Sequence, residues 1–223
     1  MSIPNRHRRL VGTSLAATLA LVMVAGCSSI LGSKTPSTIY APEPRVAADP
    51  SWPGVTWQLA LAHPEAARVL DSLRIAVRPT PGELEVYKGA SWAKTPTEQI
   101  EDALLRTLED SQKIPAVARQ GSGIAADYNL LTEVRRFEAD YAGNAVPAAT
   151  IEINAKLVHV PDQDVVASRT FLQAAPASSA NTAAVAQAFG IALGAITHDI
   201  AGWALTHGDT NQRTGAHASK KRK

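Results

Sequence analysis

Long stretches of alternating apolar and polar residues constrain the fold of this 223-residue chain more than any other feature. Residues 127–137 and 150–160 alternate in this way, and residues 165–172 follow after a turn at Pro161–Asp164. A period of two is typical of strands with one buried and one solvated face, so the pattern predicts an antiparallel meander. Phe137 breaks the alternation of its strand, which predicts a bulge or the use of both faces there.

Two helices and several shorter strands accompany the meander. Residues 55–62, 73–77 and 83–87 have strand patterns. A helix is expected over 95–111, because Thr95 can cap it, Pro96 suits its first position and Glu98 completes a capping box. Asn181 can cap a second helix over 182–205, which has an apolar stripe along one face. The polar residues Gln187, His198 and Asp199 argue against this helix being a membrane span. We therefore predict an α+β fold, a mostly antiparallel sheet with two main helices packed on one face.

The N-terminal residues predict a secretory signal peptide. Three arginines within residues 6–9 precede an apolar run over 11–25. As a helix this run would span about 22 Å, which is short of the roughly 30 Å core of a bilayer. It ends at Val24-Ala25-Gly26-Cys27, which resembles a bacterial lipobox. The resemblance implies cleavage between Gly26 and Cys27 and lipidation of Cys27, with palmitate among its acyl chains; two or more chains anchor stably.

The residues leave one alternative open for Cys27 and one for the membrane that holds it. Cys27 could instead be a buried thiol of an uncleaved anchor. The residue after the lipidated cysteine, Ser28, favours the periplasmic face of the outer membrane by the sorting pattern of Gram-negative lipoproteins, with the inner membrane as the alternative.

Composition predicts how the rest of the chain is divided. Residues 1–26 are the signal peptide, and the Ser-, Thr- and Pro-rich residues 27–53 carry the acylated cysteine and a flexible tether. The folded domain is expected over 54–205, followed by a disordered basic tail over 206–223. Lys220–Lys223, all basic, end that tail either as a solvated end or in contact with anionic lipid headgroups.

Charge and motif content exclude several functions. Without residues 1–26 the chain has 19 basic against 20 acidic residues, so a nucleic-acid-binding body is not expected. The single cysteine excludes an intramolecular disulfide and a cysteine-based zinc site. The chain has neither a Gly-x-Ser-x-Gly elbow nor a His-Glu-x-x-His motif. We therefore expect no enzyme activity, and no catalytic, cofactor-binding or metal-binding residues.

Short segments in a fixed order resemble one known family. They include Thr38–Tyr40, Leu73–Val77, Gly82–Tyr87, Ala126–Leu130 and Val165–Phe171. With the lipobox before them, they resemble the ABC-type transport auxiliary lipoproteins of the PqiC/YmbA-like group. The aromatic residues that carry the resemblance are expected to be structural; they are Tyr40, Trp92, Tyr128, Phe137, Phe171 and Trp203. For Trp92 and Tyr128 the alternative is a contact with lipid or with a partner's strand.

The resemblance implies a non-catalytic component of an envelope lipid-transport system. Its implied partners are a substrate-binding protein of the mammalian-cell-entry (MCE) type, the ABC transporter subunits and phospholipid, and some relatives suggest a homo-oligomer. The residues themselves leave other functions open. One is a stand-alone lipid-binding or envelope-integrity lipoprotein, and another is a periplasmic hydrolase, which would need a cluster of polar residues.

Overall fold

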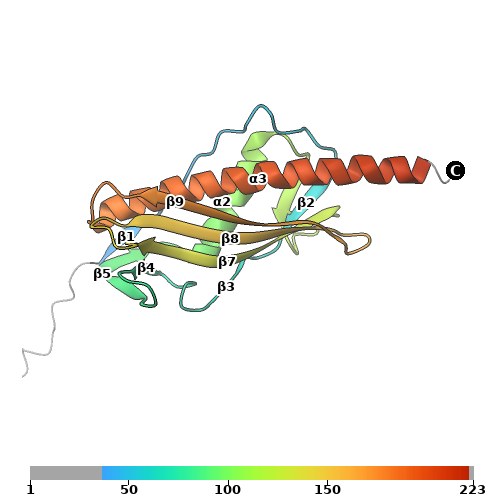
Figure 1. Cartoon of the computed structure of the whole chain (residues 1–223). Coiled ribbons are helices and arrows are strands. Elements are labelled where there is room, and N and C mark those ends of the chain that lie inside the picture. The colour runs from blue at the N-terminus through green and yellow to red at the C-terminus, as the bar shows by residue number, and fades with distance from the viewer. Residues whose placement is uncertain (1–36, 221–223) are drawn as a thin grey trace, which may run out of the picture. The chain divides into compact units, whose positions relative to one another are not determined.

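The computed structural model describes residues 37–220, with side chains through residue 215. The signal peptide, Cys27 and Lys221–Lys223 lie outside the described residues. Two helices are described, α2 (Pro96–Ser111) and α3 (Thr182–Lys220) (Figure 1). The strands are β1 (Thr38–Tyr40), β2 (Gln58–Leu61), β3 (Glu65–Ala66), β4 (Arg74–Arg78), β5 (Glu85–Trp92), β6 (Ala116–Arg119), β7 (Tyr128–Asp140), β8 (Ala148–His159) and β9 (Val165–Pro176).

The described strands form one mixed sheet centred on the long strand β7. Along one edge β7 pairs antiparallel with β8, which pairs antiparallel with β9. Along its other edge β7 pairs in parallel with β2, β3 and β4 in turn. Beyond β2 the sheet continues in parallel with β6. Beyond β4 it continues antiparallel with β5 and then parallel with β1.

The α+β class with two helices is confirmed, but the sheet is mixed. Our expectation of a mostly antiparallel sheet holds for the two long ladders of the meander, whereas the shorter strands β1, β2, β3 and β6 pair in parallel. A parallel pair needs a crossover that brings the chain back in the same direction. Alternation within a strand does not reveal such a crossover, so the sequence pattern could not predict these pairings.

The bulge predicted near Phe137 is present in β7. The register between β7 and β8 shifts between Val134 and Arg136, and Arg135 is the extra residue. The shift returns Phe137 to the buried face, where it is 1% exposed, and places Glu138 on the opposite face. A bulge re-aims side chains in this way by adding one residue to one strand.

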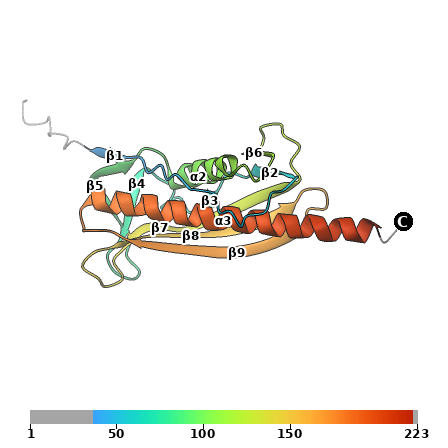
Figure 2. The ribbon, with the colours of Figure 1, turned by 90° about the horizontal axis from the view of Figure 1, so that it is seen from above.

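Both helices pack on the buried face of the sheet, side by side (Figure 2). Val185, Phe189, Leu193, Ile196 and Ile200 of α3 are almost completely buried. They share one hydrophobic cluster with the inward side chains of β8, namely Ile151, Ile153, Ala155 and Leu157. By length and composition α3 could cross a membrane, but its apolar stripe is packed inside the domain. We therefore assign α3 to the core of the domain.

The start of α2 follows the predicted capping box. The Thr95 hydroxyl oxygen accepts from the backbone N–H of Glu98, and the Glu98 carboxylate accepts from the backbone N–H of Thr95 at 2.8 Å. Two N–H groups at the helix start are thereby satisfied. The cap of α3 is also as expected, since Asn181 Oδ1 accepts from the backbone N–H of Ala184 at 2.8 Å.

The end of α3 differs from our expectation. We expected the helix to end at 205 and a disordered tail over 206–223, but α3 runs to Lys220. Gly208 is buried against Trp57, and the Tyr128 hydroxyl donates to Asn211 Oδ1 at 2.8 Å. These contacts with Trp57 and Tyr128 stabilise the last turns of the helix. The polar composition of residues 206–223 does not reveal such contacts, so it predicted disorder instead.

Residues 41–57, here called the crossing segment, run from β1 to β2 along the groove between α2 and α3 (Figure 2). Trp52 and Trp57 of this segment are 7% and 1% exposed. Glycines of α3 leave room for the side chains of the crossing segment. The pairs are Gly190 with Pro42, Gly194 with Pro44, Gly202 with Trp52 and Gly208 with Trp57.

The folded domain therefore begins earlier than we expected. We expected a flexible tether through residue 53 and a domain from 54, whereas β1 already pairs with β5 and Trp52 lies in the core. The strand β1 (Thr38–Tyr40) itself lies within the stretch that we expected to be a flexible tether. The part of the predicted tether before residue 37 lies outside the described residues.

The first prediction concerns the glycine under Trp57. In a Gly208→Ala variant the new methyl carbon would lie about 2.8 Å from Cε2 of Trp57, which is buried and cannot swing into solvent. Overpacking of this kind costs about 1–3 kcal/mol of unfolding free energy. Gly215→Ala is the matched control, because nothing lies within 4 Å of its Cβ position. Urea unfolding followed by tryptophan fluorescence should show a loss for the first variant only; equal behaviour would contradict the packing.

The second prediction concerns the extended end of α3. Tyr128→Phe removes the hydroxyl that joins β7 to Asn211, and should lower the unfolding free energy by about 1 kcal/mol. Tyr40→Phe is the control, since the Tyr40 hydroxyl makes no side-chain hydrogen bond within the described residues. Urea unfolding measures both, and an unchanged midpoint for Tyr128→Phe would mean that the helix is not docked beyond Leu205.

Candidate functional site

The first aromatic group singled out by the family resemblance lies in the centre of the core. The rings of Trp92 and Phe137 meet Phe189 of α3, with centroid separations of 5.0 Å and 4.8 Å. Trp92 and Phe137 are each 1% exposed. Tyr40, at the edge of the sheet, is half-buried and packs on the same cluster. These residues join β1, β5, β7 and α3 in one hydrophobic cluster.

The second group surrounds Tyr128, which is 2% exposed. Its ring lies 4.8 Å from the ring of Trp57 and 5.1 Å from that of His159. Burial, followed by the charges of Asp127 and Asp162, raises the pKa of Tyr128 above its ordinary value. Tyr128 is therefore a neutral hydrogen-bond donor within the core.

The third group reaches the surface. The rings of Phe171 in β9 and Trp203 in α3 lie 5.6 Å apart, and the Arg169 guanidinium carbon lies 4.7 Å from the centre of the Phe171 ring. Trp203 also contacts His207, with a centroid separation of 5.4 Å. Phe171 and Trp203 are both buried, and they support a surface that sequence reasoning did not identify.

An open hollow of about 420 Å³ lies beside this third group. Asp199 on its rim accepts a hydrogen bond from Gln173 at 2.8 Å, so its carboxylate is already engaged. Arg169 provides a permanent positive charge next to flat indole surfaces. An anionic group attached to an apolar body would suit this surface. The lining residues are Ser51, Trp52, Arg169, His198, Asp199, Gly202, Trp203, Thr206 and His207.

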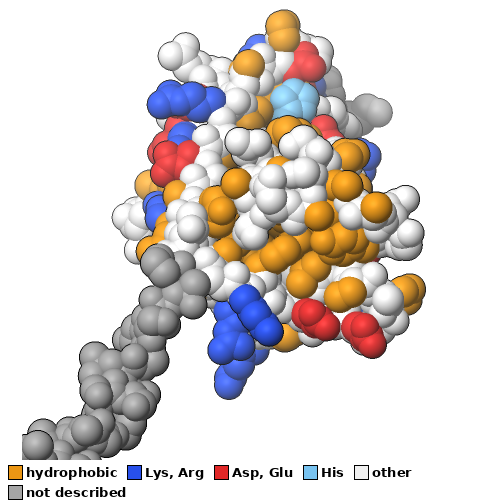
Figure 3. Space-filling view, turned by 90° about the vertical axis from the view of Figure 1, so that its left-hand side faces the viewer, with side chains coloured by type: hydrophobic (Ala, Val, Ile, Leu, Met, Phe, Trp, Pro, Cys, Tyr) orange, Lys and Arg blue, Asp and Glu red, His pale blue; other side chains and the backbone are white. Residues whose placement is uncertain are grey.

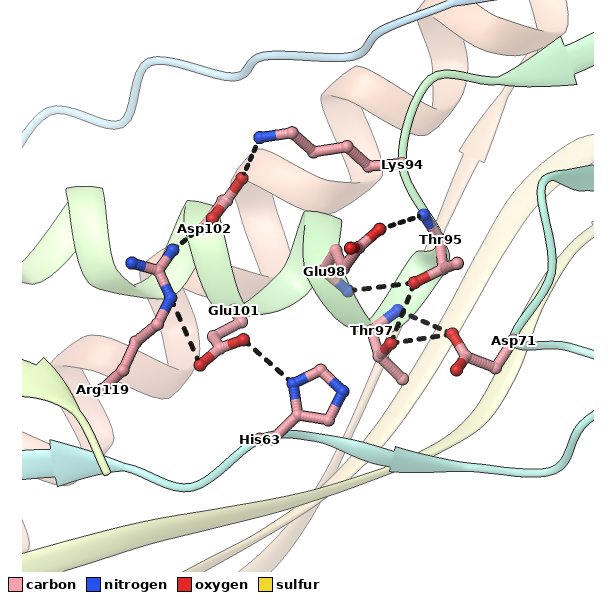
Figure 4. A network of polar contacts seen from close by, with 9 residues as sticks. All are labelled: His63, Asp71, Lys94, Thr95, Thr97, Glu98, Glu101, Asp102 and Arg119. Carbon is pink, nitrogen blue, oxygen red and sulfur yellow. Dashed lines mark hydrogen bonds and ion pairs between the residues drawn. The ribbon is translucent and has the colours of Figure 1, made fainter. Parts of the chain in front are cut away.

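A polar network holds α2 to the strands around it (Figure 4). Glu101 accepts from Nδ1 of His63 at 3.0 Å and lies 3.4 Å from Nε of Arg119. Asp102 accepts from Arg119 and from Lys94. At the helix start, the Thr97 hydroxyl donates to Asp71 at 2.7 Å. The carboxylates are all paired, so the network serves to position α2 against β6 and the β2–β3 connection.

The pKa of Asp102 reports this pairing. Burial by itself would raise the pKa, but the hydrogen bond from Lys94 and the charges of Lys94 and Arg119 outweigh it and hold the pKa below its ordinary value. The hydrogen bond to Asp102 likewise raises the pKa of Lys94. Both groups are therefore charged at neutral pH, and neither is held ready to exchange a proton there.

A small pocket of about 90 Å³ adjoins the network, between α2 and the start of the crossing segment. Gln99 lines it; its amide nitrogen donates to the Lys94 carbonyl, and its buried Oε1 has no protein partner. Ligand sites for drug-sized molecules have volumes of about 300–1,000 Å³. This pocket therefore suits a few water molecules and is too small for a lipid.

A second ion-pair network lies on the open face of the sheet, where β4 meets β7. Glu138, 1% exposed, accepts two hydrogen bonds from Arg78, at 2.8 and 2.9 Å, and one from Arg136 at 2.8 Å. Arg136 also donates to Asp140. The bond to Glu138 raises the pKa of Arg78 further above its ordinary value. A buried carboxylate with two arginines fixes the β4–β7 register, since removing either partner would leave a buried charge unpaired.

The predicted aromatic residues lie within the described part of the chain, whereas the predicted lipidation and cleavage sites do not. The predicted lipidation site at Cys27 and the cleavage site before it lie outside the described residues, so they stay predictions. Within residues 37–215, no group of three or more His, Cys, Asp or Glu residues is arranged to hold a metal ion. Sequence reasoning missed the Trp52 surface and the Glu138 network. A large aromatic in a Pro- and Ala-rich stretch was a signal for the first, and the parity break at Phe137 for the second.

The third prediction tests the α2 network by its pH dependence. Because the pKa of Asp102 is lowered in the folded protein, its stabilising effect is complete above the unfolded pKa of about 3.9 and is lost as pH falls through the folded value. Asp102→Asn should therefore cost about 1–2 kcal/mol of unfolding free energy at pH 7 and less near pH 3.

The control is Asp110→Asn on the same helix, because Asp110 is exposed and in no ion pair within the described residues. Urea unfolding at the two pH values measures both variants. A difference from wild type that stays constant between them would contradict the role of Asp102.

Comparison with known proteins agrees with this architecture. A family model described as the ABC-type transport auxiliary lipoprotein component matches residues 38–201. Among solved structures, a protein from Xanthomonas campestris is 57% identical, with 79% of this chain and 99% of that chain covered and a TM-score of 0.77. No curated protein matches the chain.

Two more distant structures also match. An uncharacterised protein of solved structure has 13% identity, 71% and 97% coverage and a TM-score of 0.56, which shows a shared fold. A PelC dodecamer from Paraburkholderia phytofirmans has 16% identity, 66% and 92% coverage and a TM-score of 0.40. The match over residues 38–201 covers most of the chain, beginning at β1 and ending within α3, and shows that the chain belongs to the ABC-type transport auxiliary lipoprotein family.

Proposed function

We propose that this protein is a non-catalytic auxiliary component of an ABC-linked lipid-transport system of the cell envelope. In this proposal acylated Cys27 holds it at the periplasmic face of the outer membrane, and its partners are an MCE-type substrate-binding protein and the transporter subunits. The observation that carries the proposal is the family match over residues 38–201, which begins eleven residues after the predicted lipidation site.

The polar chemistry of the described residues supports a binding role. The histidines that make side-chain hydrogen bonds pair with carboxylates, His63 with Glu101, His159 with Asp162 and His198 with Asp199. No serine or threonine hydroxyl meets a histidine among the hydrogen bonds of residues 37–215. A hydrolase of the serine type needs that pair. The buried polar groups instead hold strands and helices together, as in a scaffold.

A stand-alone lipid-binding protein is the second candidate. The observation that favours it is an open groove along α3, lined by Gly190, Ile191, Gly194 and Ala195 and by residues 44–47 of the crossing segment. Ile191 is 66% exposed there. The groove could hold an acyl chain against an apolar wall, although it is open along its length, whereas specific lipid sites enclose most of their ligand.

The fourth prediction tests both candidates with one experiment. Wild-type protein and a Cys27→Ala variant are expressed with the same affinity tag, crosslinked in intact envelopes, solubilised mildly and purified. Mass spectrometry should find an MCE-type protein and a transporter ATPase with the wild type. The variant, which has no acceptor thiol, should leave the membrane fraction and lose these partners.

Two other outcomes would contradict the proposal, one at the auxiliary role and one at the anchor. Phospholipid without any transporter subunit in the wild-type eluate would contradict the auxiliary role and favour the stand-alone lipid binder. Unchanged membrane fractionation of Cys27→Ala would contradict the anchor itself.

A further inference from the structure

The topology fixes the end of the domain at which the chain enters from the anchor. β4 is parallel to β7, β5 is antiparallel to β4, and β1 is parallel to β5. β1 therefore runs opposite to β7, and its first residue points toward the end of the sheet where β7 finishes. That end also holds the β7–β8 loop (141–147), the β4–β5 turn (79–84) and the β9–α3 connection (177–181). We call it the entry end.

The three connections at the entry end are mostly apolar, and the charged residues beside them, Arg78 and Asp140, belong to the ion-pair network of Glu138 on the open face of the sheet. The β7–β8 loop and the β9–α3 connection contain no charged residue, and the β4–β5 turn contains one, Glu83. Val146 and Ile39 are 38% and 66% exposed, and Ala145, Pro176 and Ala180 are also exposed. Figure 3 shows apolar side chains gathered over this end, with charged side chains at its margin. An apolar surface of this kind marks a contact with a partner or with a membrane.

The opposite end of the meander carries exposed acidic residues. Its β8–β9 turn carries Asp162 and Asp164, both exposed. The exposed Asp127 lies beside them, since its backbone carbonyl accepts from the N–H of Val160 at 2.8 Å. Three carboxylates would be repelled by anionic lipid headgroups. The two ends of the meander therefore differ in charge, and we call the end with the β8–β9 turn the acidic end. α3 starts beside the entry end and carries Arg213 and Lys220 toward the opposite one, so this difference concerns the meander and not the end of α3.

The length of chain before β1 decides which end can reach a membrane. Ten residues lie between Cys27 and Thr38, so the eleven Cα–Cα steps would span at most about 38 Å when extended and about 18 Å as a flexible coil. The 39 residues of α3 are about 58 Å long. A short connection that leaves from the entry end keeps that end close to the anchoring membrane, and the acidic end away from it.

We propose that the entry end is a membrane-contacting surface, with the uncharged β7–β8 loop and Ile39 seated in the interfacial region of the bilayer that holds the Cys27 acyl chains. This inference rests on the proposed acylation of Cys27. Apolar side chains without neighbouring charges partition into the headgroup–acyl boundary, and the anchor keeps them at high local concentration there. The domain would then stand with its entry end on the membrane and its acidic end toward the periplasm.

The fifth prediction tests this orientation in the full-length acylated protein. Cys27 is the only cysteine and its thiol is blocked by the lipid, so a cysteine introduced by Val146→Cys can be labelled alone with an environment-sensitive fluorophore. Leu131→Cys on the open face of the sheet is the matched control, since Leu131 is 40% and Val146 is 38% exposed. Both proteins are reconstituted into phosphatidylethanolamine–phosphatidylglycerol vesicles that contain spin-labelled quencher lipids.

The expected result is blue-shifted emission and severalfold stronger quenching for the label at residue 146 than for the label at residue 131. Equal quenching at both positions, or none at either, overturns the proposal. A blue shift at residue 146 in detergent without vesicles, rising with protein concentration, also overturns it, because a second copy then covers the surface. Failure of acylation is distinguishable, since the protein would not float with the vesicles and Cys27 would take up label.

Discussion

The packing of α3 against the sheet on one side and the crossing segment on the other determines the rest of the structure. Its apolar stripe closes the core over β8, and its glycines let Trp52 and Trp57 approach the helix backbone. Burial of two indoles in this way contributes several kcal/mol, at about 25 cal/mol per Å² of apolar surface. Because the crossing segment lies over both helices, residues that composition assigned to a flexible tether are part of the domain.

The candidate surfaces depend on that arrangement. With β1 and the crossing segment docked, the described chain begins at one defined end of the sheet, ten residues after the predicted lipidation site Cys27. The hollow beside Trp203 and the groove beside Ile191 both lie where the crossing segment meets α3. The two polar networks, around Glu101 and around Glu138, hold the strands and α2 in place beneath these surfaces. This member of the ABC-type transport auxiliary lipoprotein family is thus a domain whose helices and strands are joined by both apolar and ion-pair contacts.

The sequence predicted the features that depend on local patterns. Alternation located β7, β8 and β9, the parity break at Phe137 located the bulge, and the capping box located the start of α2. Features that depend on distant residues were missed. The parallel pairs of β7 need crossovers, the docking of Trp52 needs Gly202 of α3, and the final turns of α3 need Tyr128. The parity break at Phe137 was the local signal near Glu138, but its burial also depends on Arg78 of the distant strand β4, which the pattern of β7 does not reveal.

The crossing segment is an integral part of the folded domain. Hydrogen exchange of the acylated protein tests it most directly at the backbone N–H groups of Trp52 and Val55, which donate to Asp49 and Lys113 at 3.0 and 2.8 Å. We expect these N–H groups to exchange as slowly as those of β7, because their hydrogen bonds open only when the domain unfolds. Exchange at the rate of an unstructured chain would contradict it and would return residues 41–57 to the role of a flexible tether.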